Sequence, residues 1–287
     1  MLPSSPFPSP ADAPIGVFDS GVGGLSVLRH IRAQLPHEHL MYFADAGFAP
    51  YGGKSEQFVA ERALAVAAFL LERGAKALVV ACNTATISAI KALRARYPEL
   101  PIVGVEPGLK PAAALTRNGK VGVVATVVTL AGEKFLALRA QISAASQAEF
   151  LLQGCPGLAD QIERGELHTP ATVAMLEGYI APLLAQGIDT LVLGCTHYPF
   201  VLDEIKGVIA RHATGPVTLV DTGDAVARQL GRLLGTAGLL RAAGGDPRLQ
   251  GYTSAAAAPL ETAFASLLNL HPPVEESAAQ TKNQIFS

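Results

Sequence analysis

Two cysteines at matching positions are the residues of this chain best suited to chemistry. Each ends a short apolar run and stands eight residues after a glycine, Cys82 after Gly74 and Cys195 after Gly187. A buried strand that ends in a polar turn before a helix places such a side chain at its carboxyl end, where open α/β sheets bind ligands. The amino end of a following helix favours the thiolate form. One buried cysteine is ordinarily a core residue, so the repetition is what points to function.

Two thiols on opposite faces of one carbon suit inversion at that carbon, because one can remove a proton and the other can return one. Asp19 and His197 stand where they could tune the basicity of the thiols. No lysine occurs in these strand-end turns, so nothing indicates a Schiff base with PLP, and we expect no cofactor. Neutral donors suited to carboxylate oxygens surround the thiols: Ser20, Asn83, Thr84, Thr86 and Thr196.

Three other interpretations use the same residues. A zinc site could draw on Cys82, Cys195, His197 and Asp19, but Cys-x-His is not the usual spacing of paired zinc ligands, and we expect no metal. A cysteine hydrolase with Cys82, His197 and Asp19 would leave Cys195 without a role. An amino-acid binding module would need the donors but not the thiols. Cys155 has no acid or base beside it in the sequence and is interpreted as structural.

The elements that must position these residues follow from the pattern of apolar runs and turn residues. Strands are predicted at 15–18, 40–44, 78–81, 102–105, 121–126 and 190–194, and helices at 25–34, 55–73, 87–96, 169–186, 224–234 and 259–268. The Gly-rich turn at 19–24 matches neither nucleotide-binding loop pattern. We therefore predict an α/β protein of two similar doubly wound parallel-sheet domains, with the active site in the cleft between them.

The predicted domain boundaries follow the repeat. The first domain takes residues 14–106 plus 219–268, and the second takes 107–218. Residues 1–13 are rich in Pro and Ser and are predicted to be a flexible lead, and the polar segment 269–287 a disordered tail.

The bulk composition excludes several classes of protein. Of 287 residues, 49% are hydrophobic and 16% charged, and the net charge is −2, so nucleic acid is not expected as the main partner. No run of 18 apolar residues is long enough to span a membrane, and the lead lacks the pattern of a signal peptide. Three cysteines cannot all pair within the chain, which favours a reducing cytoplasm.

Four motifs in register resemble one known family. They are the stretches 18–25 (FDSGVGGL), 50–52 (PYG), 81–85 (ACNTA) and 194–199 (GCTHYP). Together, over about residues 14 to 268, they are similar to the glutamate racemases, the cofactor-independent members of the aspartate/glutamate racemase group. Aspartate racemase, or another amino-acid racemase of the same family, is the nearest alternative.

The resemblance implies roles for individual residues. Cys82 and Cys195 would be the two bases, each serving one enantiomer, with Asp19 assisting Cys82, and with His197 and, by position, Glu163 assisting Cys195. The residues implied to hold the substrate are Asp19, Ser20, Pro50, Tyr51, Gly52, Asn83, Thr84, Thr196 and His197.

The resemblance also implies a biological setting and shows two departures. The family supplies D-glutamate for peptidoglycan, and so serves cell-wall biogenesis and cell shape, as a cytoplasmic homodimer. The stretch 46–48 (Ala-Gly-Phe) replaces the family's usual Thr-Ala-Arg, and Val127 replaces a usual glycine. Neither departure replaces a group that transfers protons.

Overall fold

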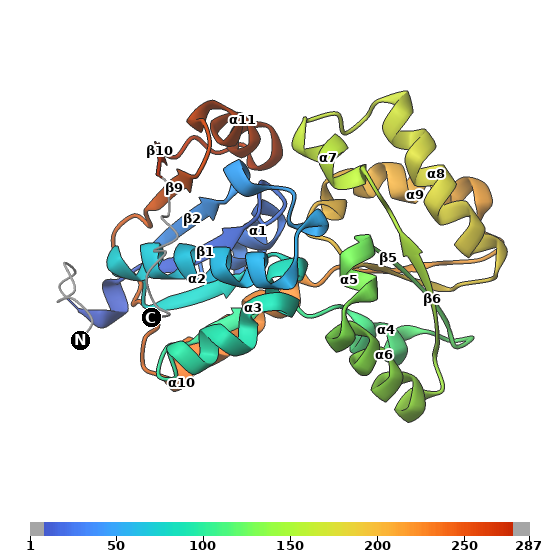
Figure 1. Cartoon of the computed structure of the whole chain (residues 1–287), viewed down its shortest axis with the longest axis horizontal. Helices are drawn as coiled ribbons and strands as arrows, with labels where there is room; N and C mark the ends of the chain where they lie inside the picture. Colours follow the sequence, from blue (N-terminus) through green and yellow to red (C-terminus); the bar gives the residue numbers. More distant parts are fainter. Residues whose placement is uncertain (1–8, 278–287) are drawn as a thin grey trace. The chain divides into compact units, whose positions relative to one another are not determined.

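The computed structural model describes residues 9–277, and the chain divides into two compact units. The first unit comprises the chain up to Val105 together with the chain from Gly223 onward. The second unit is the intervening segment, Glu106–Thr222. Each unit is built around its own parallel sheet with helices on both faces (Figure 1).

The first unit holds a six-stranded sheet in the order β10-β9-β2-β1-β3-β4, in which every pair of neighbours is parallel. The central strands are buried on both faces, which is why their sequences are continuous apolar runs rather than alternating ones. The strands are β1 (Ile15–Asp19), β2 (Leu40–Ala44), β3 (Ala77–Val80), β4 (Ile102–Gly104), β9 (Leu249–Thr253) and β10 (Val274–Glu276).

Two groups of helices cover this sheet. α2 (Glu56–Glu72) packs against α3 (Asn83–Arg96), and α1 (Leu25–Gln34) packs against α10 (Gly223–Thr236) and α11 (Ala257–Leu268). Ser55 caps α2 by accepting the N–H of Phe58 at 3.2 Å. The short 3-10 helices η2 (Ala46–Phe48) and η3 (Tyr51–Gly53) follow β2.

The second unit holds a four-stranded parallel sheet in the order β6-β5-β7-β8. Its strands are β5 (Lys120–Ala125), β6 (Glu149–Gly154), β7 (Thr190–Leu193) and β8 (Thr218–Val220). α8 (Pro170–Ala185), which contains Pro182, lies with α9 (Leu202–His212) on one side, and α4 (Leu109–Leu115) lies with α6 (Glu133–Ser146) on the other (Figure 1). The short helices are α5 (Val127–Ala131), α7 (Leu158–Glu163) and η4 (Tyr198–Val201).

The two sheets share one topology. The order β2-β1-β3-β4 in the first unit corresponds to β6-β5-β7-β8 in the second, and Cys82 and Cys195 follow the equivalent strands β3 and β7. The prediction of two similar α/β domains with doubly wound parallel sheets is confirmed. The location of the active site in a cleft between them stays a prediction.

The two compact units differ from the predicted domains at both boundaries. Residues 219–222 belong to the second unit rather than the first, because β8 pairs with β7 through Leu219 and Val220. The chain passes from the first unit to the second after Val105, one residue earlier than predicted.

Both predicted irregular ends are also wrong within the described residues. Pro10–Asp12 forms the 3-10 helix η1, capped by Ser9, and the carbonyl of Ala11 accepts a hydrogen bond from Lys76 Nζ. At the other end, β10 pairs with β9, so the segment after residue 268 is not irregular throughout. The rest of the predicted lead, 1–8, and of the predicted tail, 278–287, lies outside the described residues.

Several elements differ from the prediction for local reasons. α3 begins at Asn83 rather than at 87, because the thiol of Cys82 itself caps the helix. Other elements were not predicted, since their apolar patterns are short or interrupted. They are β9 and β10 at one edge of the first sheet, and α4, α6, β6 and α7 in the second unit. In the described part of the chain, no helix has the length and apolar character needed to cross a membrane.

Candidate active site

Cys82 sits where β3 gives way to α3. It is the N-cap residue of α3, and its Sγ accepts the backbone N–H of Ala85 at 3.5 Å. Its side chain is almost completely buried, with 6% of its surface exposed. The amino end of a helix favours negative charge on an atom placed there, so this position stabilises a thiolate.

Asp19 and Ser20 form a polar group beside this thiol. β1 pairs with β3 in parallel, so the residues after both strands emerge at the same edge of the sheet. Ser20 Oγ lies 3.8 Å from Cys82 Sγ and donates to Asp19 Oδ1 at 3.1 Å, and the N–H of Gly21 donates to the same oxygen at 3.0 Å. Asp19 is fully buried. A carboxylate is therefore linked to the thiol through one hydroxyl.

The glycine-rich turn allows this arrangement. A Cβ at Gly24 would lie 2.7 Å from Asp19 Cβ, closer than real Cβ atoms approach, and 3.0 Å from Ala81 Cβ, which is a very tight contact. The Gly-rich turn therefore serves close packing around Asp19, which agrees with the absence of a nucleotide-binding pattern in it.

The first turn of α3 contributes further donors. Asn83 and Thr84 are both buried, and Asn83 Nδ2 has no hydrogen-bond partner within residues 9–277. A buried amide donor without a partner is costly, so it is suited to meet a ligand oxygen. Thr86 has a different role from the one expected, because its Oγ1 donates to the carbonyl of Val80 at 3.1 Å and accepts the N–H of Val105 at 3.2 Å.

The 50–52 motif is placed on the same side of the first unit. Tyr51 is buried and its hydroxyl donates to Asp45 Oδ2, whereas Pro50 is exposed and Gly52 half-buried. Burial, together with the neighbouring carboxylate of Asp45, raises the pKa of Tyr51 far above its usual value. The phenol therefore stays protonated, and its proton is committed to Asp45.

In the second unit, Cys195, His197 and Glu163 form a chain of contacts. Cys195 Sγ lies 3.5 Å from His197 Nδ1, and His197 Nε2 lies 2.6 Å from Glu163 Oε1. His197 is buried, and 27% of the Glu163 side chain is exposed. Glu163 is the last residue of α7, which packs against η4 directly after His197.

The electrostatics of this chain favour a proton on the imidazole. Burial alone lowers the pKa of His197, but the contacts with Cys195 and with the Glu163 carboxylate outweigh burial and hold this pKa well above its usual value. A protonated His197 next to Sγ can pass a proton to the sulfur or receive one from it. Thr196, between the two residues in sequence, is also buried.

Comparison with known proteins identifies the family. The model of the Asp/Glu/hydantoin racemase family matches residues 15–230. The chain belongs to this family. The glutamate racemase of Pseudomonas aeruginosa is 55% identical over 228 residues, which cover 79% of this chain and 84% of that protein. That of Ectopseudomonas mendocina is 56% identical over 230 residues, covering 80% and 85%.

Solved structures of racemases share the fold. A glutamate racemase isoform from Bacillus anthracis has a TM-score of 0.82 and 31% identity, covering 92% of this chain and 97% of that one. The Escherichia coli glutamate racemase in complex with L-glutamate and the activator UDP-MurNAc-ala has a TM-score of 0.77 and 33% identity, with the same coverage. The Francisella tularensis glutamate racemase in complex with D-glutamate has a TM-score of 0.81 and 26% identity, covering 94% and 99%.

The third cysteine of this racemase-family chain lies in the same buried cluster as Cys195, but its hydrogen bond leads to neither His197 nor Glu163. Cys155 is buried and its thiol donates to the carbonyl of Gln153 at 3.6 Å. Burial raises the pKa of the Cys155 thiol to about 12. A thiol that stays protonated is a poor nucleophile, in keeping with the structural role expected for it.

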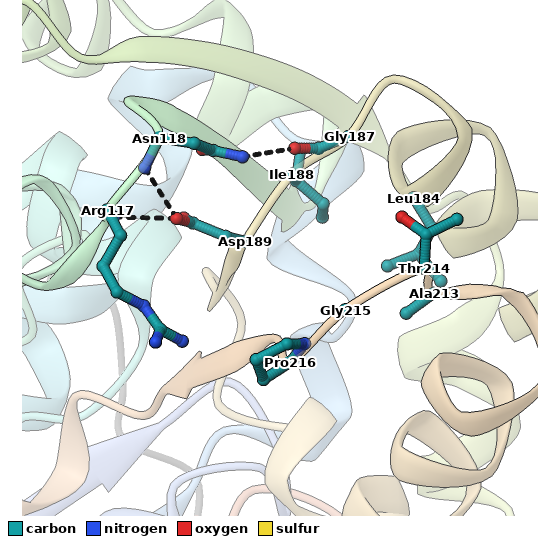
Figure 2. Close-up of a pocket in the computed structure, with 10 residues that line it drawn as sticks. All are labelled: Arg117, Asn118, Leu184, Gly187, Ile188, Asp189, Ala213, Thr214, Gly215 and Pro216. Carbon is teal, nitrogen blue, oxygen red and sulfur yellow. Dashed lines mark hydrogen bonds between the residues drawn. The ribbon is translucent and has the colours of Figure 1, made fainter.

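A pocket of the second unit lies at the wrong end of its sheet for racemase chemistry (Figure 2). Its walls are the segments just before β5, β7 and β8, whereas Cys195 follows β7 at the opposite end. The carboxylate of Asp189 accepts the N–H groups of Arg117 and Asn118 at 2.7 and 2.8 Å, so it serves to join two loops. Neither a cysteine nor a histidine is among its lining residues.

The structure brings together the predicted residues in two groups, one in each unit. Asp19, Ser20, Asn83 and Thr84 gather at Cys82, and Glu163, Thr196 and His197 gather at Cys195. That both groups serve one substrate stays a prediction. Within the described residues, no cluster of three or more His, Cys, Asp or Glu side chains is arranged to hold a metal ion. Asp45 and Arg62, which are both buried, were not predicted as functional residues. Their only signal in the sequence is that each is a charged residue among apolar ones.

Proposed function

We propose that the protein racemises glutamate without PLP, using Cys82 and Cys195 as the two acid/base groups. The observation that carries the proposal is the repetition of one half-site, in which a buried cysteine follows the equivalent strand of two sheets with the same topology. The names of the relatives support glutamate as substrate, as do the complexes of two related racemases with L- and D-glutamate.

The proposed steps balance in protons and charge. One cysteine starts as the thiolate and takes the Cα proton, which leaves a carbanion on the amino acid. The other cysteine starts as the thiol and gives its proton to the opposite face of the same carbon. The product is the other enantiomer, and the two sulfurs have exchanged protonation states.

The neighbours of each sulfur have proposed roles in this exchange. Asp19, acting through Ser20, assists proton transfer at Cys82, and His197 with Glu163 assists it at Cys195. The free amide donor of Asn83 and the adjacent Thr84 are suited to hold a substrate carboxylate without adding a fixed charge. Such donors can serve both enantiomers, since both carry the carboxylate, and they can stabilise the negative charge that reaches its oxygens when the Cα proton leaves.

The wider role follows the family resemblance. We propose that the product D-glutamate enters peptidoglycan precursor synthesis, and that the protein works in the cytoplasm as a homodimer. An aspartate racemase is the nearest alternative. Relative rates with glutamate and aspartate would separate the two, because a glutamate racemase should turn over aspartate far more slowly.

The deciding experiment measures exchange at Cα. Purified protein without added PLP should erase the optical rotation of L-glutamate and incorporate deuterium from D₂O at Cα. Cys82→Ala and Cys195→Ala should each lower kcat by at least about 10³-fold. Cys155→Ala is the control thiol variant and should retain exchange at Cα, because the hydrogen bond of the Cys155 thiol goes to the carbonyl of Gln153 and not to His197 or Glu163.

Each alternative predicts a different outcome. A dependence on added PLP would contradict the proposal. If the protein were a cysteine hydrolase, Cys195→Ala would keep its hydrolytic activity. The unmodified protein would then not exchange the Cα proton of glutamate. A binding module would bind glutamate without any exchange.

A further inference from the structure

A buried ion pair lies beside the Cys82 half-site and has no part in the proposed chemistry. Arg62 in α2 and Asp45 after β2 are 1% and 0% exposed. The guanidinium donates through Nε to Asp45 Oδ2 at 2.9 Å and through Nη2 to Oδ1 at 2.8 Å. A buried pair of this kind is weak evidence for stability, because removing both charges from water costs about as much as their attraction returns. Its geometry suggests that it orients other groups.

The segment from Asp45 to Tyr51 contacts Arg62 directly at Asp45 and Phe48, and is linked to it at Tyr51 through Asp45. Asp45 accepts the guanidinium donors and also the Tyr51 hydroxyl. The ring of Phe48 covers the guanidinium, with Cζ 3.6 Å from the ring centre. Arg62 therefore fixes the start, the middle and the end of this segment. A planar, bidentate donor that also stacks on an aromatic ring is a task for Arg that Lys does not perform.

The same segment is joined to the catalytic candidates. The N–H of Asp45 donates to the carbonyl of Asp19 at 2.9 Å. Tyr51 belongs to the same buried cluster as Cys82, and η3, which begins at Tyr51, contacts α3, which Cys82 caps. A shift of the Tyr51 ring would therefore change the space beside Sγ.

We propose that Arg62 and Asp45 are positioning residues for the Cys82 half-site, and that they hold Tyr51 and its turn where the substrate must lie against Sγ. This inference rests on the proposed racemase function. Phe48 stands where the family usually has an arginine. Its ring covers the guanidinium of Arg62 and so adds to these contacts. The pair acts through Tyr51, and neither of its members transfers a proton.

The test compares two buried ion pairs of the same unit. Lys76 and Glu38 are almost as buried as the first pair, with side chains 3% and 2% exposed. Lys76 precedes β3, however, so it lies at the opposite end of that strand from Cys82. Arg62→Met and Lys76→Met each leave one buried carboxylate without its cation, so both should lower the melting temperature. The effects on catalysis should differ.

Catalysis is measured as kcat, KM and the isotope effect with Cα-deuterated D- and L-glutamate. Arg62→Met and Tyr51→Phe should lower kcat/KM by about 10- to 100-fold. A loss of this size is expected when reacting groups are slightly misplaced. Their isotope effect should rise for the enantiomer whose proton Cys82 removes and fall for the other, because only one proton transfer becomes slower. Lys76→Met should keep KM and both isotope effects.

A double variant separates positioning from stability. Arg62→Met combined with Asp45→Leu removes both buried charges and should recover much of the melting temperature. It should not recover KM or the isotope effects, since Tyr51 has lost its acceptor. Recovery of all three, or equal behaviour of Arg62→Met and Lys76→Met, would overturn the inference. Absence of racemisation by the unmodified protein would instead overturn the proposed function.

Discussion

Replacement of Glu163 by glutamine tests the Cys195 half-site most directly. The side chain keeps its size and an oxygen that can accept from His197, but it loses the negative charge. Since the contacts with Cys195 and with the Glu163 carboxylate hold the pKa of His197 above its usual value, Glu163→Gln should lower this pKa. The imidazole would then lose its proton at a lower pH.

The size of the effect follows from the contact itself. His197 Nε2 and Glu163 Oε1 are 2.6 Å apart. A hydrogen bond to a charged group contributes about 1.5–3 kcal/mol, against about 1 kcal/mol for a neutral one. Glutamine should therefore cost about 0.5–2 kcal/mol, which corresponds to about 2- to 30-fold in kcat/KM where the transition state depends on this charge. The partial exposure of Glu163 favours the lower half of this range.

The assay is the pH profile of kcat/KM for both enantiomers, supported by melting temperatures. The folded pKa of His197 lies above its unfolded value of about 6.5, so the stability contributed by the protonated ring is fully present below about pH 6.5. That stability is lost as the pH rises through the folded pKa. The melting temperature of Glu163→Gln should fall furthest below that of the parent near pH 6, and the gap should narrow toward alkaline pH.

A surface pair provides the control. Glu177 contacts His212 at 3.0 Å, but both side chains are more than a third exposed. Glu177→Gln should leave the pH profile of racemisation unchanged. If Glu163→Gln instead keeps kcat/KM within about twofold of the parent and keeps the same pH profile, the assigned role of the carboxylate is refuted.

Three further predictions concern the surroundings of the half-sites. Thr86→Val should lower the free energy of unfolding by about 0.5–1.5 kcal/mol in urea titrations, because it removes the hydroxyl that bonds the carbonyl of Val80 and the N–H of Val105, while that N–H keeps the carbonyl of Val80 as an acceptor at 3.1 Å; an unchanged midpoint would contradict the structural role of Thr86. Gly24→Ala should lower the free energy of unfolding by about 1–3 kcal/mol and reduce the rate of racemisation, since its Cβ would lie 2.7 Å from Asp19 Cβ. A variant with the parental melting temperature and rate would show that the turn can relax. Cys155 should resist iodoacetamide at pH 8 in the folded protein, as followed by peptide mass spectrometry, because its thiol pKa is about 12; rapid labelling would contradict its buried, protonated state.

The local features of this protein could be predicted from sequence because local interactions decide them. β1, β2, β3, β5 and β7 are continuous apolar runs that end in turns, and such runs form buried parallel strands wherever they pack. The equal spacing of the cysteines from their preceding glycines predicted the equivalent positions at the ends of β3 and β7. Glu163 was reached only through the family resemblance, because nothing near it in the sequence marks it as functional.

Other features could not be predicted because they depend on contacts between distant residues. β9 and β10 become strands only by adding to the edge of the sheet beside β2, and β8 joins β7 in the second unit, which moved the domain boundary. The capping of α3 by a thiol escaped prediction for a local reason instead, since cysteine is an unusual cap and the helix pattern alone begins later.

The sequence by itself determined the central strands of the two sheets, the turns that end them and the position of one cysteine after each of two equivalent strands. The tertiary structure decided which side chains meet those cysteines. Glu163 reaches His197 because α7 packs against η4, and the carboxylate of Asp45, which accepts the Tyr51 hydroxyl, meets Arg62 from α2. Such contacts join residues that the chain holds well apart, so the packing of the elements, and not their local pattern, sets the environment of each thiol.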